Sequence, residues 1–408
     1  MHRLAAVAAL LLLPGLAPAK VELLGKASIP GTAADRSGLT DTLKDGTPHN
    51  RLGGIGSGIA CTGQGNRYVL IADRGPKDGI VPFACRFHEF DIAMRPGAKP
   101  AVLPTLVSTT LMKLPSGKQL IGLSSAFDAK NSPDAPRFDP EGVRVGRTGT
   151  LFVADEYGPF VCEFDRQGKR LRVLDVPAKF LITKPGATPK EELDRNKSGR
   201  GPNRGLEGLA ISPDGSKLYA ILQSPLLQDR GDKQVPGKFT AVNLRILELP
   251  TGEGRPREFV YPMESGEHGV NEILAINDHE FLVLERDNKA GKDARFKKLF
   301  KIDIRGATDV SKIDRLPEKG LPDGAKPVAK KAFLDLLDPA FGLAGEQFPE
   351  KIEGLAFGPD LPDGRRLLLV TTDNDFKADE PTWFFAFAID KADLPGYQPQ
   401  VFDREKPK

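Results

Sequence analysis

The chain has 408 residues, and 58 Lys and Arg against 55 Asp and Glu leave a formal net charge of +3. Because charges of both signs are interspersed, the sequence lacks the concentrated basic face of a nucleic-acid-binding protein, and we expect no nucleic-acid partner. With 3 Cys and 5 His, neither a disulfide-dense scaffold nor a zinc site is indicated.

The first 19 residues have the pattern of a signal peptide. Residues 1–3 are a short basic start, residues 4–13 are an unbroken apolar run, and residues 17–19 are the small residues of a cleavage site. The apolar run is too short to span a bilayer as a mature helix. We therefore expect a mature chain of residues 20–408 that is a single domain, a monomer, free of the membrane, and periplasmic or secreted.

A unit of short strands occurs five times along the mature chain. A lone strand at 21–31 comes first, and the units then start near residues 57, 141, 207, 272 and 353. Each unit has an apolar strand, a turn rich in Gly, Asp or Asn, a second apolar strand that ends in polar or acidic residues, and a third strand. A fourth strand follows in most units. Four short strands with turns between them are typical of a propeller blade.

This pattern predicts an all-β fold, a β-propeller of five four-stranded blades. A sixth blade is the alternative if residues 100–138 contain a degenerate unit. The units are spaced more widely than the roughly 40–50 residues of a compact blade, so we expect long loops, two of them at 184–204 and 305–328. The last unit lacks a fourth strand, and we expect strand 21–31 to complete it and close the ring.

Acidic residues recur at fixed places in these units. Glu141, Glu207, Glu272 and Glu353 each start a first strand, where the first unit has Ser57. The innermost strands of a propeller line its central channel, so we expect these residues to meet at one mouth of it. The acids that end the second strands should lie at the same mouth: Asp73, Asp155, Glu156, Glu285 and Asp373.

Carboxylates gathered around one axis repel each other, and something must offset that repulsion. Calcium would do so, because it takes about 6–8 oxygen ligands in flexible geometry. Alternatively, each Glu could accept backbone N–H groups from the next blade as a structural latch. Arg137, Arg204 and Arg286 lie nearby in the sequence; they could form ion pairs or hold a phosphate ester against a bound metal.

Five motifs taken together resemble the family known as "esterase-like activity of phytase", also called the phytase-like domain. They are R-x-D-P-E-G at 137–142, D-E-Y-G-P at 155–159, N-R-G-L-E-G-L-A at 203–210, L-E-R-D at 284–287 and I-E-G-L-A-F at 352–357. The resemblance extends from about residue 23 to residue 389. It implies a propeller in an exported bacterial protein with phosphoesterase chemistry. It points to Arg137, Asp139, Glu141, Asp155, Glu156, Arg204, Glu207, Glu285 and Arg286.

The sequence departs from the family pattern in two units. Gln223 stands where the family more often has an acid, and Ser57 replaces the first Glu. These departures argue against a metal site that needs five acids.

The leading hypothesis is an exported, calcium-dependent hydrolase of small-molecule phosphoesters. The catalytic candidates are Glu141 and Glu207, with Arg137, Arg204 and Arg286 to neutralise the phosphoryl oxygens. The alternatives are a non-catalytic propeller that binds a ligand or partner at the acidic mouth, and a calcium-dependent lactonase or sugar-ester hydrolase. The candidate metal ligands are Glu141, Asp155, Glu156, Glu207, Glu272, Glu285, Glu353 and Asp373.

Overall fold

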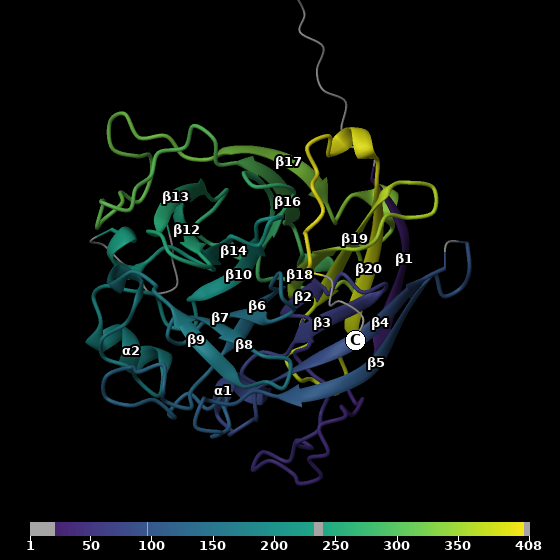
Figure 1. Cartoon of the computed structure of the whole chain (residues 1–408), viewed down its shortest axis with the longest axis horizontal. Coiled ribbons are helices and arrows are strands. Elements are labelled where there is room, and N and C mark those ends of the chain that lie inside the picture. The colour runs from purple at the N-terminus through teal and green to yellow at the C-terminus, as the bar shows by residue number, and fades with distance from the viewer. Residues whose placement is uncertain (1–20, 96, 232–239, 404–408) are drawn as a thin grey trace, which may run out of the picture.

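The computed structural model describes residues 21–95, 97–231 and 240–403 (Figure 1). The predicted signal peptide, residues 1–19, lies outside this part of the chain. None of the helices within it is long and apolar enough to cross a membrane. Apart from single 3-10 turns, the described helices are α1 (Pro76–Gly79) and α2 (Pro189–Arg195), and the architecture is built from strands.

The described strands form five sheets of four strands each, and the sheets surround a common axis as the blades of a propeller (Figure 1). Strands β2, β6, β10, β14 and β18 lie nearest the axis. The bounds of the strands follow, from the innermost strand of each blade outward. Blade 1 has β2 (Gly58–Cys61), β3 (Arg67–Ile71), β4 (Arg86–Met94) and β5 (Val102–Leu111). Blade 2 has β6 (Pro140–Val145), β7 (Leu151–Asp155), β8 (Val161–Phe164) and β9 (Arg170–Leu174). Blade 3 has β10 (Leu206–Ile211), β11 (Lys217–Leu222), β12 (Asn243–Pro250) and β13 (Arg257–Pro262). Blade 4 has β14 (Gly269–Ala275), β15 (Glu280–Arg286), β16 (Lys297–Asp303) and β17 (Ala329–Asp335). Blade 5 has β18 (Ile352–Phe357), β19 (Arg366–Thr372), β20 (Thr382–Ile389) and β1 (Val21–Ile29).

The N-terminal strand closes the ring, as the sequence predicts. β1 pairs antiparallel with β20, from Val21 opposite Ile389 to Ile29 opposite Thr382, so blade 5 contains both ends of the fold. The alternative of six blades is wrong, because residues 102–111 form β5, the outer strand of blade 1. Residues 112–139 make only isolated bridges, such as that between Ala84 and Ile121.

Apolar side chains from neighbouring blades form the core. Leu209 and Ile221 of blade 3 belong to one buried cluster with Val270 and Ile273 of blade 4. Each such side chain, fully removed from water, contributes about 1.5–3 kcal/mol to folding. The faces of each blade are therefore held by the next blade, which fixes the positions of the inner strands around the axis.

Glycine in the repeated E-G pair lets the inner strands come close together. A Cβ on Gly208 would lie 2.7 Å from the Cα of Glu272, and one on Gly142 would lie 2.7 Å from the backbone nitrogen of Leu209. No larger residue fits at these distances. The repeated glycine therefore brings the acidic residue beside it close to the axis.

Candidate functional site

A repeated irregularity in the inner strands presents side chains toward the axis. β10 has a bulge between Leu206 and Gly208, which leaves Glu207 out of the ladder. β6 and β18 have irregularities at the places of Glu141 and Glu353. Bulges of this kind re-aim side chains and are frequent beside functional sites. The structure thus brings Glu141, Glu207 and Glu353 to one mouth of the ring.

In blade 4 the residue at this position is Asn271. The bulge in β14 lies between Val270 and Glu272, so Asn271 is the residue left out of the ladder. Asn271 Nδ2 donates to Glu207 Oε1 at 2.8 Å and to Glu353 Oε1 at 3.3 Å. We call Ser57, Glu141, Glu207, Asn271 and Glu353 the axial ring.

The expectation that Glu272 joins this ring is wrong by one residue. Glu272 lies one residue farther along its inner strand, at the position that Gly208 and Gly142 take in blades 3 and 2. Its Oε1 accepts the backbone N–H groups of Leu209 and Ile273, each at 3.0 Å. Its Oε2 lies 3.0 Å from Arg144 Nη2. Glu272 therefore holds blades 2, 3 and 4 together and does not face the acidic mouth.

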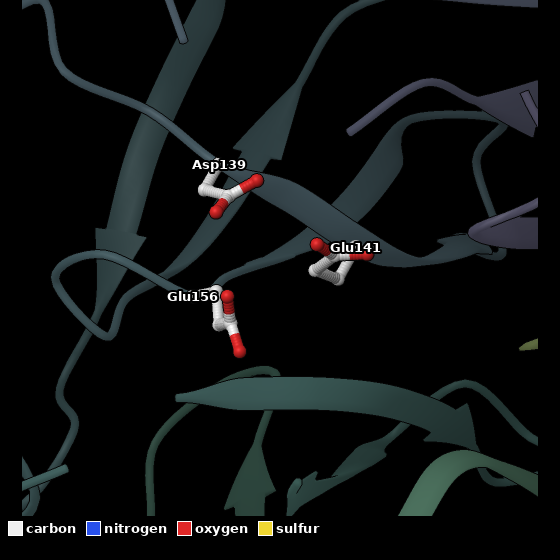
Figure 2. Close-up of side chains that lie close together, drawn as sticks. All are labelled: Asp139, Glu141 and Glu156. Carbon is white, nitrogen blue, oxygen red and sulfur yellow. The ribbon is translucent and has the colours of Figure 1, made fainter. Parts of the chain in front are cut away.

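The carboxylates of Asp139, Glu141 and Glu156 lie close together. All three are buried, and one oxygen of each lies within 4.8 Å of the others. Figure 2 shows Asp139 and Glu141 on one stretch of chain and Glu156 on the segment that follows β7. Burial, together with the charge of Asp139, raises the pKa of Glu156 to about 7. Near neutral pH this group can therefore hold or release a proton.

Glu141 is the least satisfied member of the cluster. It is 7% exposed, and its carboxylate accepts no hydrogen bond from any residue that the structure describes. Burial, reinforced by the charges of Glu207 and Asp139, raises its pKa well above the usual range for a Glu. Glu207 Oε2 and Asn271 Oδ1 are likewise buried without a donor. A buried acceptor without a donor is costly, and such atoms mark places where a ligand or ion is missing.

These unpaired atoms fit a hard divalent cation. All are carboxylate or amide oxygens, which are the ligands that calcium and magnesium prefer. Glu141, Glu207 and Asn271 offer such oxygens at the mouth of the ring, with Glu353 beside them. The sequence-predicted metal ligands Glu156 and Asp373 also lie beside this set, and, like Glu353, each already faces a cation of the protein.

Four basic side chains surround the carboxylates. Arg74 Nη1 donates to Asp139 Oδ2 at 2.6 Å and to Glu156 Oε2 at 3.3 Å. Arg286 Nη2 donates to Glu353 Oε1 at 2.9 Å, and Lys351 Nζ to Asp373 Oδ2 at 2.8 Å. Arg204 Nη1 donates to Gln223 Oε1, and Gln223 Nε2 donates to Glu207 Oε1 at 2.5 Å. Of these cations, Arg204 and Arg286 were predicted from the sequence.

The pKa values at the second-strand ends follow from this packing. Burial and the charge of Asp373 raise the pKa of Asp73 well above its ordinary value. Burial raises the pKa of Asp373 to about 6, although Lys351 opposes the shift. Burial would lower the pKa of Lys351, but the charges of Asp373 and Glu353 raise it. Asp73 and Asp373 therefore keep their protons to a higher pH than ordinary Asp carboxyl groups do.

Two predicted site residues, Arg137 and Asp155, have structural partners away from the axial ring. Arg137 Nη1 donates to Glu192 Oε1 at 3.1 Å, and its guanidinium lies over the ring of Tyr157 at 4.7 Å. Asp155 accepts the backbone N–H groups of Asp139 and Gly158, at 2.8 and 2.7 Å. It shapes the turn that carries Glu156. Neither side chain is directed to the mouth of the ring.

Glu285 also lies elsewhere. It accepts the hydroxyl of Tyr261 at 2.8 Å and the ammonium of Lys330 at 3.0 Å, and His268 Nδ1 lies 2.9 Å from it. This cluster lies between blades 3 and 4, because Tyr261 belongs to β13 and Lys330 to β17. The residue that blade 4 contributes to the mouth from this strand is the next one, Arg286, because β-strand side chains alternate between two directions.

Asn271, Arg74 and Lys351 were not predicted from the sequence as site residues. Asn271 precedes Glu272 directly, and only the bulge decides which of the two faces the axis. Arg74 follows β3 in blade 1 but pairs with Asp139 of blade 2, a contact between residues 65 apart in the chain. Lys351 lies just before β18, and its Nζ donates to Asp373, just after β19.

A pocket opens beside this cluster. Its volume is about 530 Å³, and its lining includes Arg74, Asp78, Tyr157, Asn203 and the apolar side chains of Ile80 and Leu123. Arg74 links the pocket to the acidic cluster, because the same guanidinium contacts Asp139 and Glu156. A small molecule in this pocket would thus meet a buried cation in front of a row of carboxylates.

Residues 50–376 match the family described as phytase-like, esterase-like activity of phytase. The chain belongs to the phytase-like family. The match contains the whole axial ring and the four basic residues around it, so the resemblance read from the five motifs is confirmed. The family description names an esterase-like activity and specifies neither a phosphoester nor a metal for this phytase-like chain.

A relative from Arthroderma benhamiae, described as an uncharacterized secreted protein, is 28% identical to the phytase-like chain. The similarity covers 67% of this chain and 64% of the relative, so the chain spans less than two thirds of that relative's length.

Solved structures with a similar fold share little sequence with the phytase-like chain. A calcium-binding protein, regucalcin, from Agrobacterium tumefaciens strain C58 is 12% identical, with a TM-score of 0.37 and coverage of 86% of this chain and 94% of that chain. A GH43 β-1,3-galactosidase is 12% identical, with a TM-score of 0.42 and coverage of 88% and 94%. At these scores, neither likeness bears on the chemistry of the site.

Proposed function

We propose that this protein is an exported, metal-assisted hydrolase of small-molecule esters, with phosphoesters as its substrates. The observation that carries the proposal is Glu141. It is a buried carboxylate without a hydrogen-bond donor among the described residues, and it lies within 4.8 Å of Asp139 and Glu156. A structural latch would leave its carboxylate hydrogen-bonded, as Glu272 is to the backbone of the next blade. An unpaired buried carboxylate is instead suited to a cation or a reacting proton.

Glu141, Glu207, Asn271 and Glu353 are the residues that would hold a hard divalent cation such as calcium. When bound, such a cation would offset the repulsion among the carboxylates and act as a Lewis acid toward an ester oxygen. Glu207 is held for this role by Gln223 and Asn271, which donate to one of its oxygens and leave the other unpaired.

The basic residues would bind the anionic part of the substrate. Arg74 lines the pocket, and Nη2 of its guanidinium donates to the exposed carboxylate of Asp78. Arg204 and Arg286 lie at the rim of the axial ring, where their charges would neutralise phosphoryl oxygens. Glu156, with a pKa of about 7, would exchange a proton with the leaving group or the attacking water.

The test is a panel of hydrolysis assays on the mature chain. 4-Nitrophenyl phosphate, bis(4-nitrophenyl) phosphate, 4-nitrophenyl acetate and a gluconolactone are compared with added calcium and with EDTA. We expect calcium-dependent release of 4-nitrophenol from a phosphate ester, reduced about 100-fold or more in Glu141→Gln. Turnover of the lactone or acetate alone would replace the phosphoester assignment. No turnover of any of the four would contradict a hydrolase.

A non-catalytic propeller that binds its ligand at the same mouth is the second candidate. The ion pairs of Arg74 with Asp139 and Glu156 favour it, because these groups already neutralise each other in the free protein. Such a protein would show a calcium-dependent or phosphate-dependent melting temperature without turnover in the panel.

Export and the single-domain monomer are also proposals. Removal of residues 1–19 would give a mature protein that begins at Lys20, which intact-mass measurement of the exported protein tests. Sedimentation analysis of that protein would test the monomer, since a dimer would sediment with twice its mass.

A further inference from the structure

Asp78 occupies the face of Arg74 that is turned to the pocket. Arg74 Nη2 donates to Asp78 Oδ1 at 2.7 Å, while Arg74 Nη1 donates to Asp139 and Glu156 inside the cluster. The Arg74 side chain is 5% exposed, whereas that of Asp78 is 81% exposed. Asp78 can therefore exchange the guanidinium for solvent, while Arg74 stays paired with Asp139 and Glu156.

The turn that carries Asp78 has a strained and fixed backbone. Lys77, Asp78 and Gly79 have φ values of 53°, 56° and 74°. For residues other than glycine this left-handed region is unfavourable, and such strain is found where function requires a particular geometry. Ser124 N donates to the carbonyl oxygen of Gly79 at 2.8 Å, and Ser124 Oγ to that of Asp78 at 3.3 Å.

Packing holds the backbone of this turn, whereas the exposed side chain of Asp78 is free to move. A Cβ on Gly79 would lie 2.4 Å from both the carbonyl oxygen of Gly122 and the hydroxyl of Tyr157. The turn is therefore pressed against the wall of the pocket. Rotation of the Asp78 side chain toward solvent would expose Arg74 Nη2 to the pocket without movement of the backbone.

We propose that Asp78 is a specificity-determining residue, whose carboxylate takes the place of the substrate's anionic group on Arg74 until that group displaces it. The inference rests on the proposed function, because it assumes that the pocket beside the acidic cluster admits the substrate. A phosphate group makes more charge-assisted hydrogen bonds to a guanidinium than a single carboxylate oxygen does, so it can displace Asp78. A neutral ester cannot displace Asp78, so it meets an Arg74 that is still paired with the Asp78 carboxylate.

The test compares the binding of inorganic phosphate to three forms of the full mature chain by isothermal titration calorimetry. Asp78→Asn removes the competing charge and suits the left-handed backbone, which Asn tolerates well. Asp194→Asn is the matched control. It neutralises another exposed carboxylate in this region, on α2, whose partner is Lys190 at 2.6 Å and not Arg74. We expect about threefold to tenfold tighter phosphate binding in Asp78→Asn and no change in Asp194→Asn.

A kinetic readout separates the two proposals. If the wild type hydrolyses 4-nitrophenyl phosphate, Asp78→Asn should lower KM for it by a similar factor, and Asp194→Asn should leave KM unchanged. If no ester is hydrolysed but Asp78→Asn still binds phosphate more tightly, the hydrolase fails and the role of Asp78 stands. Equal phosphate affinity in the wild type and Asp78→Asn, or equal tightening in Asp194→Asn, would overturn it. So would the absence of phosphate binding in all three forms.

Discussion

Arg144 and Glu272 form an ion pair among the inner strands of the ring, with Arg144 Nη2 3.0 Å from Glu272 Oε2. Arg144 also donates to the carbonyl oxygens of Ile59 and Ile273, both at 2.9 Å. One guanidinium of blade 2 thus ties blade 1 to blade 4. The pair separates the acidic mouth from the apolar pocket at the other end of the inner strands, which Arg144 lines together with Ile59.

Breaking this pair should destabilise the fold. At pH 8, Arg144→Met leaves the Glu272 carboxylate buried without its counter-charge, and we expect the free energy of unfolding to fall by about 3–5 kcal/mol. The double variant Arg144→Met with Glu272→Gln should recover at least half of that loss. Urea unfolding of the three forms measures both effects. A double variant that is as unstable as the single one would mean that Arg144 acts through its backbone contacts alone.

The same pair predicts a pH dependence of stability. Burial raises the pKa of Glu272 from 4.5 to about 7, although Arg144 opposes the shift. The folded state thus binds this proton more tightly than the unfolded state does. The contribution of Glu272 is full below about pH 4.5 and is lost as the pH rises through 7. Relative to the wild type, Glu272→Gln should therefore gain stability between pH 5 and pH 8, on the order of 2 kcal/mol. Parallel stability curves for the two proteins would refute this role.

Metal binding should distinguish Glu141 from Glu272, which the sequence repeat alone treats as equivalents. Calcium at about 100 times its Kd should stabilise the wild type by about 2.7 kcal/mol, and EDTA should remove that gain. We expect Glu141→Gln to lose most of the calcium-dependent rise in melting temperature and Glu272→Gln to keep it. An equal response of both variants would place the metal, if any, outside the axial ring.

Arg204 should matter for turnover more than for stability. Its guanidinium donates to Gln223 and to the carbonyl oxygen of Asn203. We expect Arg204→Ala to leave the melting temperature almost unchanged and to reduce phosphoester turnover at least about tenfold, since the loss of a transition-state donor costs about 100- to 1000-fold in typical enzymes. Arg204→Lys should recover little, because Lys lacks the planar two-pronged geometry. Full turnover in Arg204→Ala would remove this residue from the site.

Ring closure by β1 should be essential to the whole fold. Deletion of residues 20–31 exposes the edge of β20 and removes the half-buried side chains of Val21, Leu23 and Ile29, at a cost of at least about 3 kcal/mol. Thermal unfolding should show a lower midpoint and weaker cooperativity. The point variant Glu22→Ala, in an exposed position of the same strand, is the control and should unfold like the wild type. An unchanged transition after the deletion would show that four blades and three strands suffice.

The sequence by itself determined the architecture of this protein. Strand length, turn residues and alternation are local properties, so the repeat predicted five blades, with a sixth as the alternative, and the missing fourth strand of the last unit predicted that residues 21–31 complete it. The same repeat located Glu141, Glu207 and Glu353, because equivalent positions in a propeller are related by its axis. The E-G pair marked these places, since its glycine is required where neighbouring inner strands approach each other.

Only the tertiary structure decided which polar side chains face one another. The bulge in β14 moves the strand register by one residue. As a result, Asn271 faces the axis and Glu272 faces Arg144. Nothing in the sequence N-E-I-L reveals this bulge. The partners of buried charges are likewise set by distance in space. Arg137 is held by Glu192, 55 residues later, and Arg74 reaches Asp139 from the neighbouring blade. Since a buried charge is stable only beside its partner, packing between the blades determined which predicted residues form the site.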